Sequence, residues 1–330
     1  MSMLRISLLV LFAAGAAAQT IQLGRPMVDA HNCYPYEGQW GDRIDRALSA
    51  GFPVSIEQDL TWYVDPATGQ GREVISHAEK AIGNEPDLRH YFFERVRPIV
   101  ERALRENKRD TWPLIVLHFD FKSDAAPLLQ SVWKLLEEYE PWLTTAQKTG
   151  NPADLTPFDV KPILAITEDS VLQEDAFYRQ VPVGQRLLVF GSAHMNRKGT
   201  VAMAPSALLT EKPTTYRRWW NNSWAVVEKG GQAKAGKWTA ADMKRLKRLV
   251  DYAHDAGFLI RFYTLDGFTA AENRGWDQNY NFGSRKAVTA RWKAAMEAGV
   301  DFIATDQYEG LADVMESRAA MGTSRPGGGK

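Results

Sequence analysis

Short apolar segments alternate with amphipathic helical patterns along most of the chain, and this alternation restricts the possible folds more than any other feature of the sequence. The expected strands are residues 27–31, 54–60, 114–120, 163–166, 187–190, 224–227, 259–263 and 302–305. The expected helices, whose apolar residues recur at helical spacing, are 44–50, 88–104, 125–139 and 239–256. Such an alternation predicts a parallel sheet with crossover helices.

Eight strands favour a closed α/β barrel, the (β/α)8 or TIM barrel, over the alternative of an open doubly wound sheet. Residues 19–320 are expected to form this one domain, because their number suits a single barrel. Segments 145–161 and 200–237 have irregular sequence patterns, so we expect them to be long insertions between barrel elements. The Gly-rich residues 321–330 are expected to form a disordered tail.

The chain begins with a pattern typical of an export signal. Arg5 is the only charged residue before Arg25, and an apolar stretch runs from residue 6 to residue 18. We expect residues 1–18 to be a signal peptide, cleaved near Ala18 and Gln19, and the protein to be secreted or periplasmic. The alternative is an uncleaved membrane anchor, which a run this short disfavours.

Composition narrows the class of partner. The formal net charge is zero, and a nucleic-acid-binding surface would require an excess of basic residues. We therefore expect no nucleic-acid partner. We also expect a monomer, and its partner to be a small-molecule or lipid substrate. The aromatic residues Tyr216, Trp219 and Trp220 predict either a lid that makes a peripheral membrane or sugar contact, or the packing of an insertion. Cys33 is the single cysteine, which excludes an intrachain disulfide.

The candidate site follows from the barrel, because the active sites of such barrels lie at the carboxyl ends of the strands. The chemically capable residues expected there are His31, Glu57, Asp59, His77, Asp120 and Lys122. Glu57 and Asp59 are two residues apart on an extended strand, so their side chains point the same way. Two such carboxylates repel each other unless a cation lies between them, which predicts a hard divalent ion, Ca²⁺ or Mg²⁺. Asp120 would add a third oxygen ligand, and Lys122 would hold an anionic group of the substrate.

Five short motifs in this order resemble those of the barrel phosphodiesterase superfamily of phosphatidylinositol phospholipase C and glycerophosphodiester phosphodiesterases. They are His31-Asn32, the E-x-D pattern of residues 57–59, the segment 74–77 that ends in a second histidine, residues 118–122 in place of an E-x-K strand, and residues 299–306, which read Gly-Val-Asp-Phe-Ile-Ala-Thr-Asp. The resemblance covers most of the chain after the expected signal.

The resemblance implies a metal-dependent phosphoric diester hydrolase that acts on a glycerophosphodiester or a phospholipid headgroup. It implies that His31 and His77 form the general acid/base pair, that Glu57, Asp59 and Asp120 are the metal ligands, and that Asn32, Lys122, Arg261 and Tyr263 bind the substrate. Where the substrate has a hydroxyl next to the phosphate, it also implies internal attack and a cyclic phosphate product.

The chain departs from the usual motifs at three positions. Asn32 stands where these enzymes often have arginine, Asp120 stands where glutamate is more usual, and Ala78 follows His77 where aspartate is common. The departures indicate a divergent branch with a His-Asn first motif, and they leave the identity of the headgroup open.

Two functions of other classes are compatible with the same barrel. A secreted glycoside hydrolase needs two facing carboxylates, for which Glu168 and Asp266 are the candidates, but it leaves His31 and His77 without a role. A barrel that binds phosphate esters without cleaving them is the other alternative.

Overall fold

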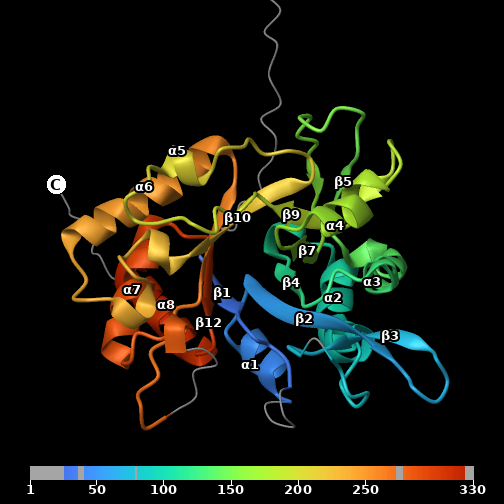
Figure 1. Ribbon diagram of the computed structural model, residues 1–330, viewed down its shortest axis with the longest axis horizontal. Helices are drawn as coiled ribbons and strands as arrows, with labels where there is room; N and C mark the ends of the chain where they lie inside the picture. The colour runs from blue at the N-terminus through green and yellow to red at the C-terminus, as the bar shows by residue number, and fades with distance from the viewer. Residues whose placement is uncertain (1–25, 36–40, 79, 273–277, 324–330) are drawn as a thin grey trace, which may run out of the picture.

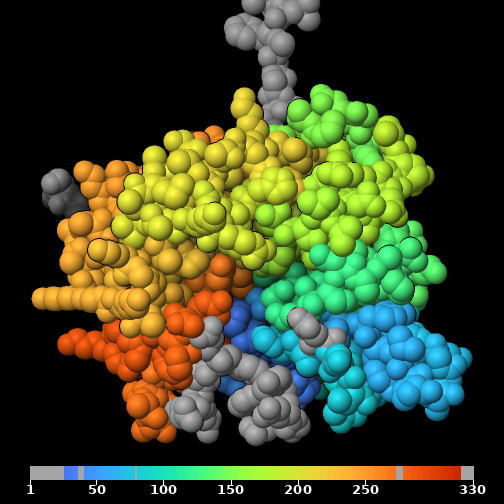
Figure 2. All heavy atoms as spheres, viewed as in Figure 1, coloured from blue at the N-terminus to red at the C-terminus, as the bar shows by residue number. Residues whose placement is uncertain are grey.

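The computed structural model describes residues 26–35, 41–78, 80–272 and 278–323, and its central feature is a closed ring of eight parallel strands. The ring consists of β1 (Met27–Ala30), β2 (Val54–Val64), β4 (Ile115–Phe121), β7 (Ile163–Thr167), β9 (Phe190–Ser192), β10 (Arg217–Ser223), β11 (Leu259–Tyr263) and β12 (Phe302–Thr305). It closes because β1 pairs in parallel with both β2 and β12. The predicted TIM barrel is therefore confirmed. N-terminal, middle and C-terminal segments meet near the centre of the face shown in Figure 2.

Helices lie around the strands (Figure 1). The α-helices are α1 (Arg43–Ser49), α2 (Glu94–Glu106), α3 (Ala126–Glu138), α4 (Val171–Glu174), α5 (Pro205–Leu208), α6 (Ala240–Ala256), α7 (Arg285–Ala298) and α8 (Tyr308–Thr323). The π-helical turns are η1 (Arg89–Phe93) and η4 (Asp175–Arg179). The 3₁₀ turns are η2 (Arg109–Thr111), η3 (Glu140–Trp142), η5 (Trp224–Val226), η6 (Gln232–Lys234) and η7 (Gln278–Tyr280). All four predicted helices are present, and none of the described helices is long and apolar enough to cross a bilayer.

Two of the predicted strands were placed wrongly. Residues 224–226 form the turn η5, and the sixth strand is β10, seven residues earlier, inside the segment expected to be an insertion. The reason is its composition: β10 carries Asn221 and Asn222, which the pattern of apolar residues does not mark as strand. The fifth predicted strand spans two elements, β8 (Arg186–Leu187) and the start of β9.

The structure also contains strand pairs that are not part of the ring of parallel strands. The long strand β2 continues beyond the barrel and pairs in antiparallel register with β3 (Gly71–Ile75), which returns the chain toward the barrel (Figure 1). A small second sheet joins β5 (Thr145–Gln147), β6 (Phe158–Asp159) and β8, so the segment 145–161 is more regular than expected.

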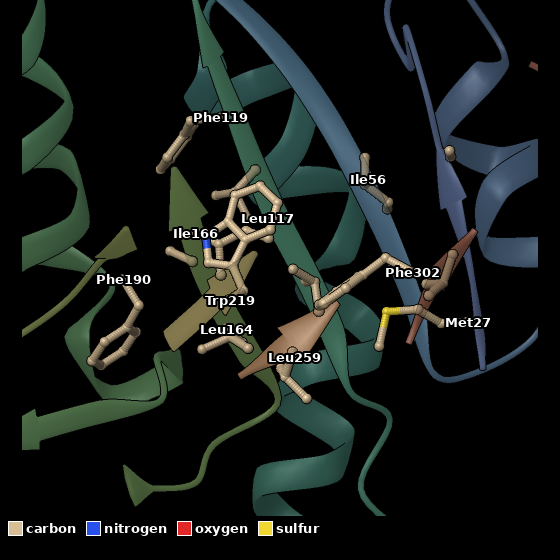
Figure 3. Close-up of a cluster of buried hydrophobic side chains, with 14 of the residues drawn as sticks. Met27, Ile56, Leu117, Phe119, Leu164, Ile166, Phe190, Trp219, Leu259 and Phe302 are labelled. Atoms are coloured by element: carbon tan, nitrogen blue, oxygen red, sulfur yellow. The ribbon is translucent and has the colours of Figure 1, made fainter. Parts of the chain in front are cut away.

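The inner face of the barrel changes from apolar to polar along each strand. Residues of one strand that are two apart share a face, and the pairs that show this change are Met27 and Asp29, Trp219 and Asn221, and Leu259 and Arg261. The apolar members belong to the buried cluster in Figure 3, and Trp219 is fully buried, with its indole N–H donating to the carbonyl of Thr167 at 3.2 Å. Tyr216 and Trp220 are also buried, so this aromatic group packs the fold and is not an exposed lid.

Helix α6 begins with a capping box, whose contribution to stability can be tested separately. The Thr239 side chain accepts from the Asp242 amide at 3.3 Å, while Asp242 accepts from the Thr239 amide at 2.9 Å. Replacing Thr239 with alanine removes this cap and is expected to lower the free energy of unfolding by about 1 kcal/mol in urea titrations. Thr200→Ala, at an exposed position outside any helix, is the matched control; equal losses in both variants would contradict the role of the cap.

Candidate active site

The side chains predicted to form the site gather at the carboxyl end of the barrel. In the parallel register of β2 and β4, Glu57 lies opposite His118 and Asp59 lies opposite Asp120. His31 follows β1, and its backbone N–H bonds to the carbonyl of Thr305 at the end of β12. A pocket of about 330 Å³ opens here, and His31, Glu57 and Asp120 line it.

The three predicted metal ligands form one cluster. Glu57, Asp59 and Asp120 each offer a carboxylate oxygen, and these oxygens lie within 4.8 Å of one another. Asp59 is fully buried, and burial together with the charge of Asp120 raises its pKa to about 8. Its Oδ1 has no hydrogen-bond partner among the residues that the structure describes. An all-oxygen donor set with an unsatisfied buried carboxylate oxygen fits a hard divalent cation.

Lys122 lies between two of these carboxylates. Its Nζ is 2.8 Å from Asp59 Oδ2 and 2.7 Å from Asp120 Oδ2, and its side chain is partly accessible. Burial opposes the charge, but the two carboxylates together hold the pKa of Lys122 above its usual value. The ammonium group is thus permanently charged at the edge of the cluster.

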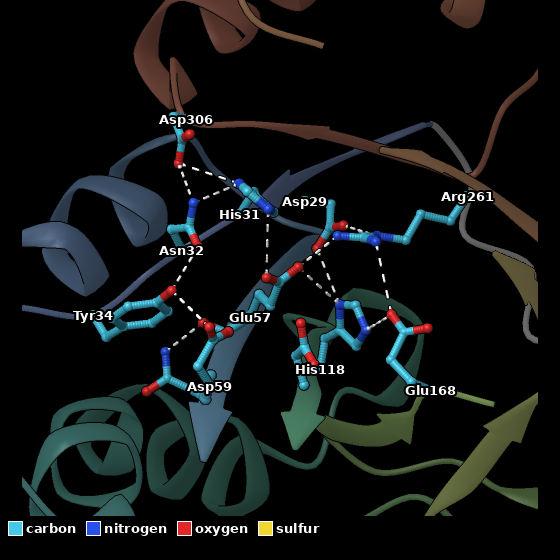
Figure 4. Close-up of polar contacts among 12 residues, drawn as sticks. Asp29, His31, Asn32, Tyr34, Glu57, Asp59, His118, Glu168, Arg261 and Asp306 are labelled. Carbon is cyan, nitrogen blue, oxygen red and sulfur yellow. Dashed lines mark hydrogen bonds and ion pairs between the residues drawn. The ribbon is translucent and has the colours of Figure 1, made fainter. Parts of the chain in front are cut away.

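His31 is held from both sides of its ring. Nδ1 lies 3.4 Å from Asp306 Oδ1 and 2.9 Å from Asn32 Nδ2, whereas Nε2 lies 3.8 Å from Glu57 Oε1 (Figure 4). Burial lowers the pKa of this imidazole, but the charges of Glu57 and Asp306 outweigh burial and raise it to about 9.

The side chain of Asn32 forms hydrogen bonds with neighbouring residues of the site. It is 3% exposed, its backbone has a left-handed φ of 51°, and Tyr34 OH lies 2.5 Å from its Oδ1. Tyr34 OH is also 2.7 Å from Asp59 Oδ2. In the structure Asn32 links His31 to Tyr34 and Asp306, and its contact with a substrate stays a prediction.

His77 reaches the same end of the barrel through the β2–β3 hairpin. The amide of Ser76 donates to the carbonyl of Asp59 at 2.9 Å, so the next residue lies beside the carboxylate cluster. His77 is exposed, and its pKa is lowered by partial desolvation and by the charge of Lys122. The predicted histidine pair therefore shares one electrostatic environment, since the charge of His31 also acts on His77.

Arg261 is buried beneath the pocket and is already committed to partners within the protein. Its Nε donates to Asp29 and its Nη2 to Glu57 Oε2 at 2.5 Å (Figure 4). Its Nη1 donates to Asn221 at 3.2 Å. Arg261 is 2% exposed and lines the pocket, where it orients Glu57; its contact with a substrate stays a prediction. Tyr263, the other predicted contact on β11, also lines the pocket.

His118 completes this buried layer. Its Nδ1 is 3.5 Å from Glu57 Oε2, its Nε2 is 3.0 Å from Glu168 Oε1, and its ring packs edge-on against Trp219. Burial and the charge of Arg261 oppose protonation, but the contacts with acidic groups raise the pKa of His118 to about 10.

The prediction from sequence missed several contributors to the site, among them Asp29, Tyr34, Asn221 and Asp306. Asp29 had a usable signal, because it precedes His31 by two residues on the same strand face. Asp306 ends the last motif, where no role was assigned to it. Asn221 was hidden because its strand was not recognised.

The carboxylate pair required by a glycoside hydrolase is not presented to the pocket. Glu168 lines it, but Asp266 does not. Asp266 is buried, accepts from the Thr305 hydroxyl and the Asp306 amide at 2.8 Å each, and burial beside Asp306 raises its pKa well above the usual value. Asp266 is thus bonded within the protein and does not face Glu168 across the pocket, as that reaction would require.

Comparison with known proteins adds information on the fold alone. No protein-family profile matches the chain, and no curated protein matches it. Among solved structures, a glycerophosphodiester phosphodiesterase from Parabacteroides distasonis ATCC 8503 is 11% identical, with a TM-score of 0.42 and coverage of 89% of this chain and 98% of that one. A glycerophosphoryl diester phosphodiesterase from the same organism is 10% identical, with a TM-score of 0.42 and coverage of 89% and 87%.

A different kind of enzyme resembles the chain equally well. HPPK-DHPS from Plasmodium falciparum is 12% identical, with a TM-score of 0.46 and coverage of 92% of this chain and 50% of that one. Likenesses this distant do not identify a reaction, so the function has to be argued from the side chains in the pocket.

Proposed function

We propose that the chain is a metal-dependent phosphoric diester hydrolase that cleaves a glycerophosphodiester or a phospholipid headgroup phosphodiester. One observation carries the proposal: a carboxylate cluster and a lysine lie at the end of the barrel where His31, Glu57 and Asp120 line a pocket, and the charges of Lys122 and His31 act on a second histidine, His77. This combination supplies positive charge for a phosphate and two groups for proton transfer.

Carboxylates outnumber cationic groups around the site. The carboxylates include Asp29, Glu57, Asp59, Asp120, Glu168 and Asp306, and the cationic groups paired with them are His31, Arg43, His118, Lys122 and Arg261. A bound divalent ion would offset this excess of negative charge and allow an anionic phosphate to approach.

Glu57, Asp59 and Asp120 would hold the ion, either Ca²⁺ or Mg²⁺. When bound, such an ion supplies Lewis-acid polarisation of a phosphoryl oxygen. Glu57 suits the role of ligand because Arg261 and His118 fix its Oε2, and its Oε1 is left toward His31. Lys122 would neutralise a second phosphoryl oxygen.

His31 and His77 would move the protons. One takes the proton of the attacking hydroxyl or water, and the other protonates the leaving oxygen. Asp306 and Asn32 hold the His31 ring, which reduces the reorganisation needed at each turnover. If the substrate carries a neighbouring hydroxyl, that hydroxyl is the attacking group and the product is a cyclic phosphate.

Removal of the metal tests this proposal. The protein is assayed with bis(p-nitrophenyl) phosphate and glycerophosphodiesters in Ca²⁺, Mg²⁺ or EDTA, with p-nitrophenyl glycosides as a substrate control. We expect diester hydrolysis that EDTA removes and that one of the two ions restores. Full activity in EDTA would contradict the metal site, and glycoside cleavage would contradict the reaction. Binding of a diester without hydrolysis under every condition would indicate a non-catalytic barrel.

We also propose that the protein is exported and acts as a monomer. The expected signal peptide, residues 1–18, lies outside the described residues. Residues 321–323 end helix α8, and the remainder of the expected tail is likewise outside them. N-terminal sequencing of the protein from the producing cells would identify the cleavage site.

A further inference from the structure

The pocket has two walls of different chemistry, and they lie across the barrel from each other. Asp124 follows β4, and Glu168 and Asp169 follow β7; Tyr263 and Tyr280 belong to β11 and the segment after it. In the closed strand order, three strands lie between β4 and β11 in either direction, so these two strands stand on opposite sides of the ring, and β7 is the neighbour of β4. Asp124 therefore lies across the pocket from the aromatic residues, with Glu168 and Asp169 on the next strand.

The acidic wall keeps negative charge available to a ligand. Asp124 accepts from the Ser170 hydroxyl and the Gln173 amide, at 2.7 Å each, and both donors are uncharged. Glu168 is 23% exposed and is oriented by His118 and by the Asn221 amide, which lies 2.9 Å and 3.0 Å from its two oxygens.

The third acidic residue, Asp169, is 17% exposed. It accepts from the backbone amide of Met195 at 3.0 Å, and the exposed His194 ring is 2.7 Å away. The buried Arg217 also lies 3.6 Å from its Oδ1, so Asp124 is the member of the acidic wall whose bonded neighbours are all uncharged. The cationic side chains that line the pocket are His31, Arg261 and the exposed Arg197. His31 lies between Glu57 and Asp306, and Arg261 is bonded to Asp29 and Glu57, so both of these cations pair with carboxylates outside the acidic wall.

The aromatic wall is built from two tyrosines in contact. The rings of Tyr263 and Tyr280 are 5.8 Å apart and perpendicular, at 88°. Tyr280 also stands edge-on to His31, with ring centroids 6.4 Å apart, so the aromatic wall adjoins a proposed catalytic residue. The guanidinium of Arg261 lies over the ring of Tyr263, 5.7 Å from its centroid, so this wall already holds one cation of the protein. Electron-rich ring faces beside carboxylates are the surroundings that proteins use to bind organic cations.

We propose that this pocket selects phosphodiesters whose alcohol part carries a positive charge, an ammonium or quaternary ammonium group. The inference rests on the proposed function and deepens it, because it names the class of the headgroup. The phosphate would lie at Lys122 and the carboxylate cluster, and the cationic end would lie between the tyrosines and the wall formed by Asp124, Glu168 and Asp169. An anionic headgroup would meet repulsion there, and a neutral polyol would forgo the cation–π and ionic attraction.

The test compares substrates that differ only in this charge. With glycerophosphocholine and glycerophosphoglycerol, we expect kcat/KM to be at least about tenfold higher for the choline diester. Asp124→Asn keeps the hydrogen-bonding shape but removes one charge, and it is expected to reduce that ratio by about fivefold. Asp251→Asn, an exposed position on α6, is the matched control and should leave the ratio unchanged. Tyr263→Leu removes a ring from the other wall and provides a second, independent reduction of the ratio.

A binding measurement separates this inference from the proposed reaction. Choline chloride and glycerol are titrated into the protein by calorimetry, where no turnover is needed. Binding of choline that Asp124→Asn weakens, without hydrolysis of any diester, would support the cation pocket and overturn the hydrolase. Hydrolysis of both diesters with equal kcat/KM, or no detectable choline binding, would overturn the cation pocket and leave the hydrolase standing.

Discussion

Replacing His31 with alanine is expected to lower kcat for phosphodiester hydrolysis by about 10³-fold, with a smaller change in KM. A positioned acid or base contributes roughly 10²–10⁴ in rate, and His31 is held in place by Asp306 and Asn32 at one edge and by Glu57 at the other. The loss should fall mainly on kcat, because the imidazole transfers a proton in the transition state. Lys122 and the carboxylate cluster remain in the variant and still bind the phosphate. Steady-state kinetics with bis(p-nitrophenyl) phosphate measures both constants.

His77→Ala belongs to the same experiment, and His90→Ala is its matched control. His77 should lose activity on the same scale, because both imidazoles are needed in one catalytic cycle. His90 is 74% exposed, pairs with Asp87 on the outside of the barrel, and should be replaceable without loss. If His31→Ala retained more than about a tenth of the activity while folded, the histidine pair would not be the acid/base pair.

The barrel was predictable from the sequence because most of its strands have a recognisable local sequence pattern. β2, β4, β7, β11 and β12 are runs of apolar and β-branched residues close to a turn or a helix end, and such runs are visible without knowledge of the fold. β10 was not visible, because its role is to carry polar residues to the site. Its Asn221 faces Glu168 and Arg261 inside the barrel, and a strand with two asparagines has a weak strand pattern.

The chemistry of the site was predictable where strand alternation and motif order suffice. Glu57 and Asp59 had to share a face, and the structure brings Asp120 to them in register. Strand alternation does not reveal which partners a side chain binds in the folded protein. Arg261 could have pointed a free guanidinium at a phosphate, and only the positions of Asp29, Glu57 and Asn221 around it show that its donors are already used.

The buried Arg261 network leads to the second large effect, which is on stability. Arg261→Met is expected to lower the free energy of unfolding by about 3–5 kcal/mol, because it leaves Asp29 and Glu57 without their shared counter-charge in the barrel interior. Urea or thermal unfolding in EDTA measures the loss, and the chelator removes any contribution from a bound ion. Arg46→Met is the surface control: its pair with Glu309 is 32% and 47% exposed, so the loss there should stay within about 1 kcal/mol.

A second substitution identifies the cause of that loss. If uncompensated charge destabilises Arg261→Met, then adding Asp29→Asn should recover part of the stability, because the amide removes one of the two stranded charges while keeping its shape. If the loss came from missing side-chain packing instead, the double variant would be no more stable than Arg261→Met.

Arg261→Met also bears on function, since Glu57 without Arg261 is no longer held by its Oε2. The ion concentration needed for half-maximal binding should then rise by about 10–100-fold, the range found when a partner behind a metal ligand is removed. Calorimetric titration with Ca²⁺ or Mg²⁺ measures this directly, and an unchanged affinity would show that Arg261 supports the fold and not the ligand.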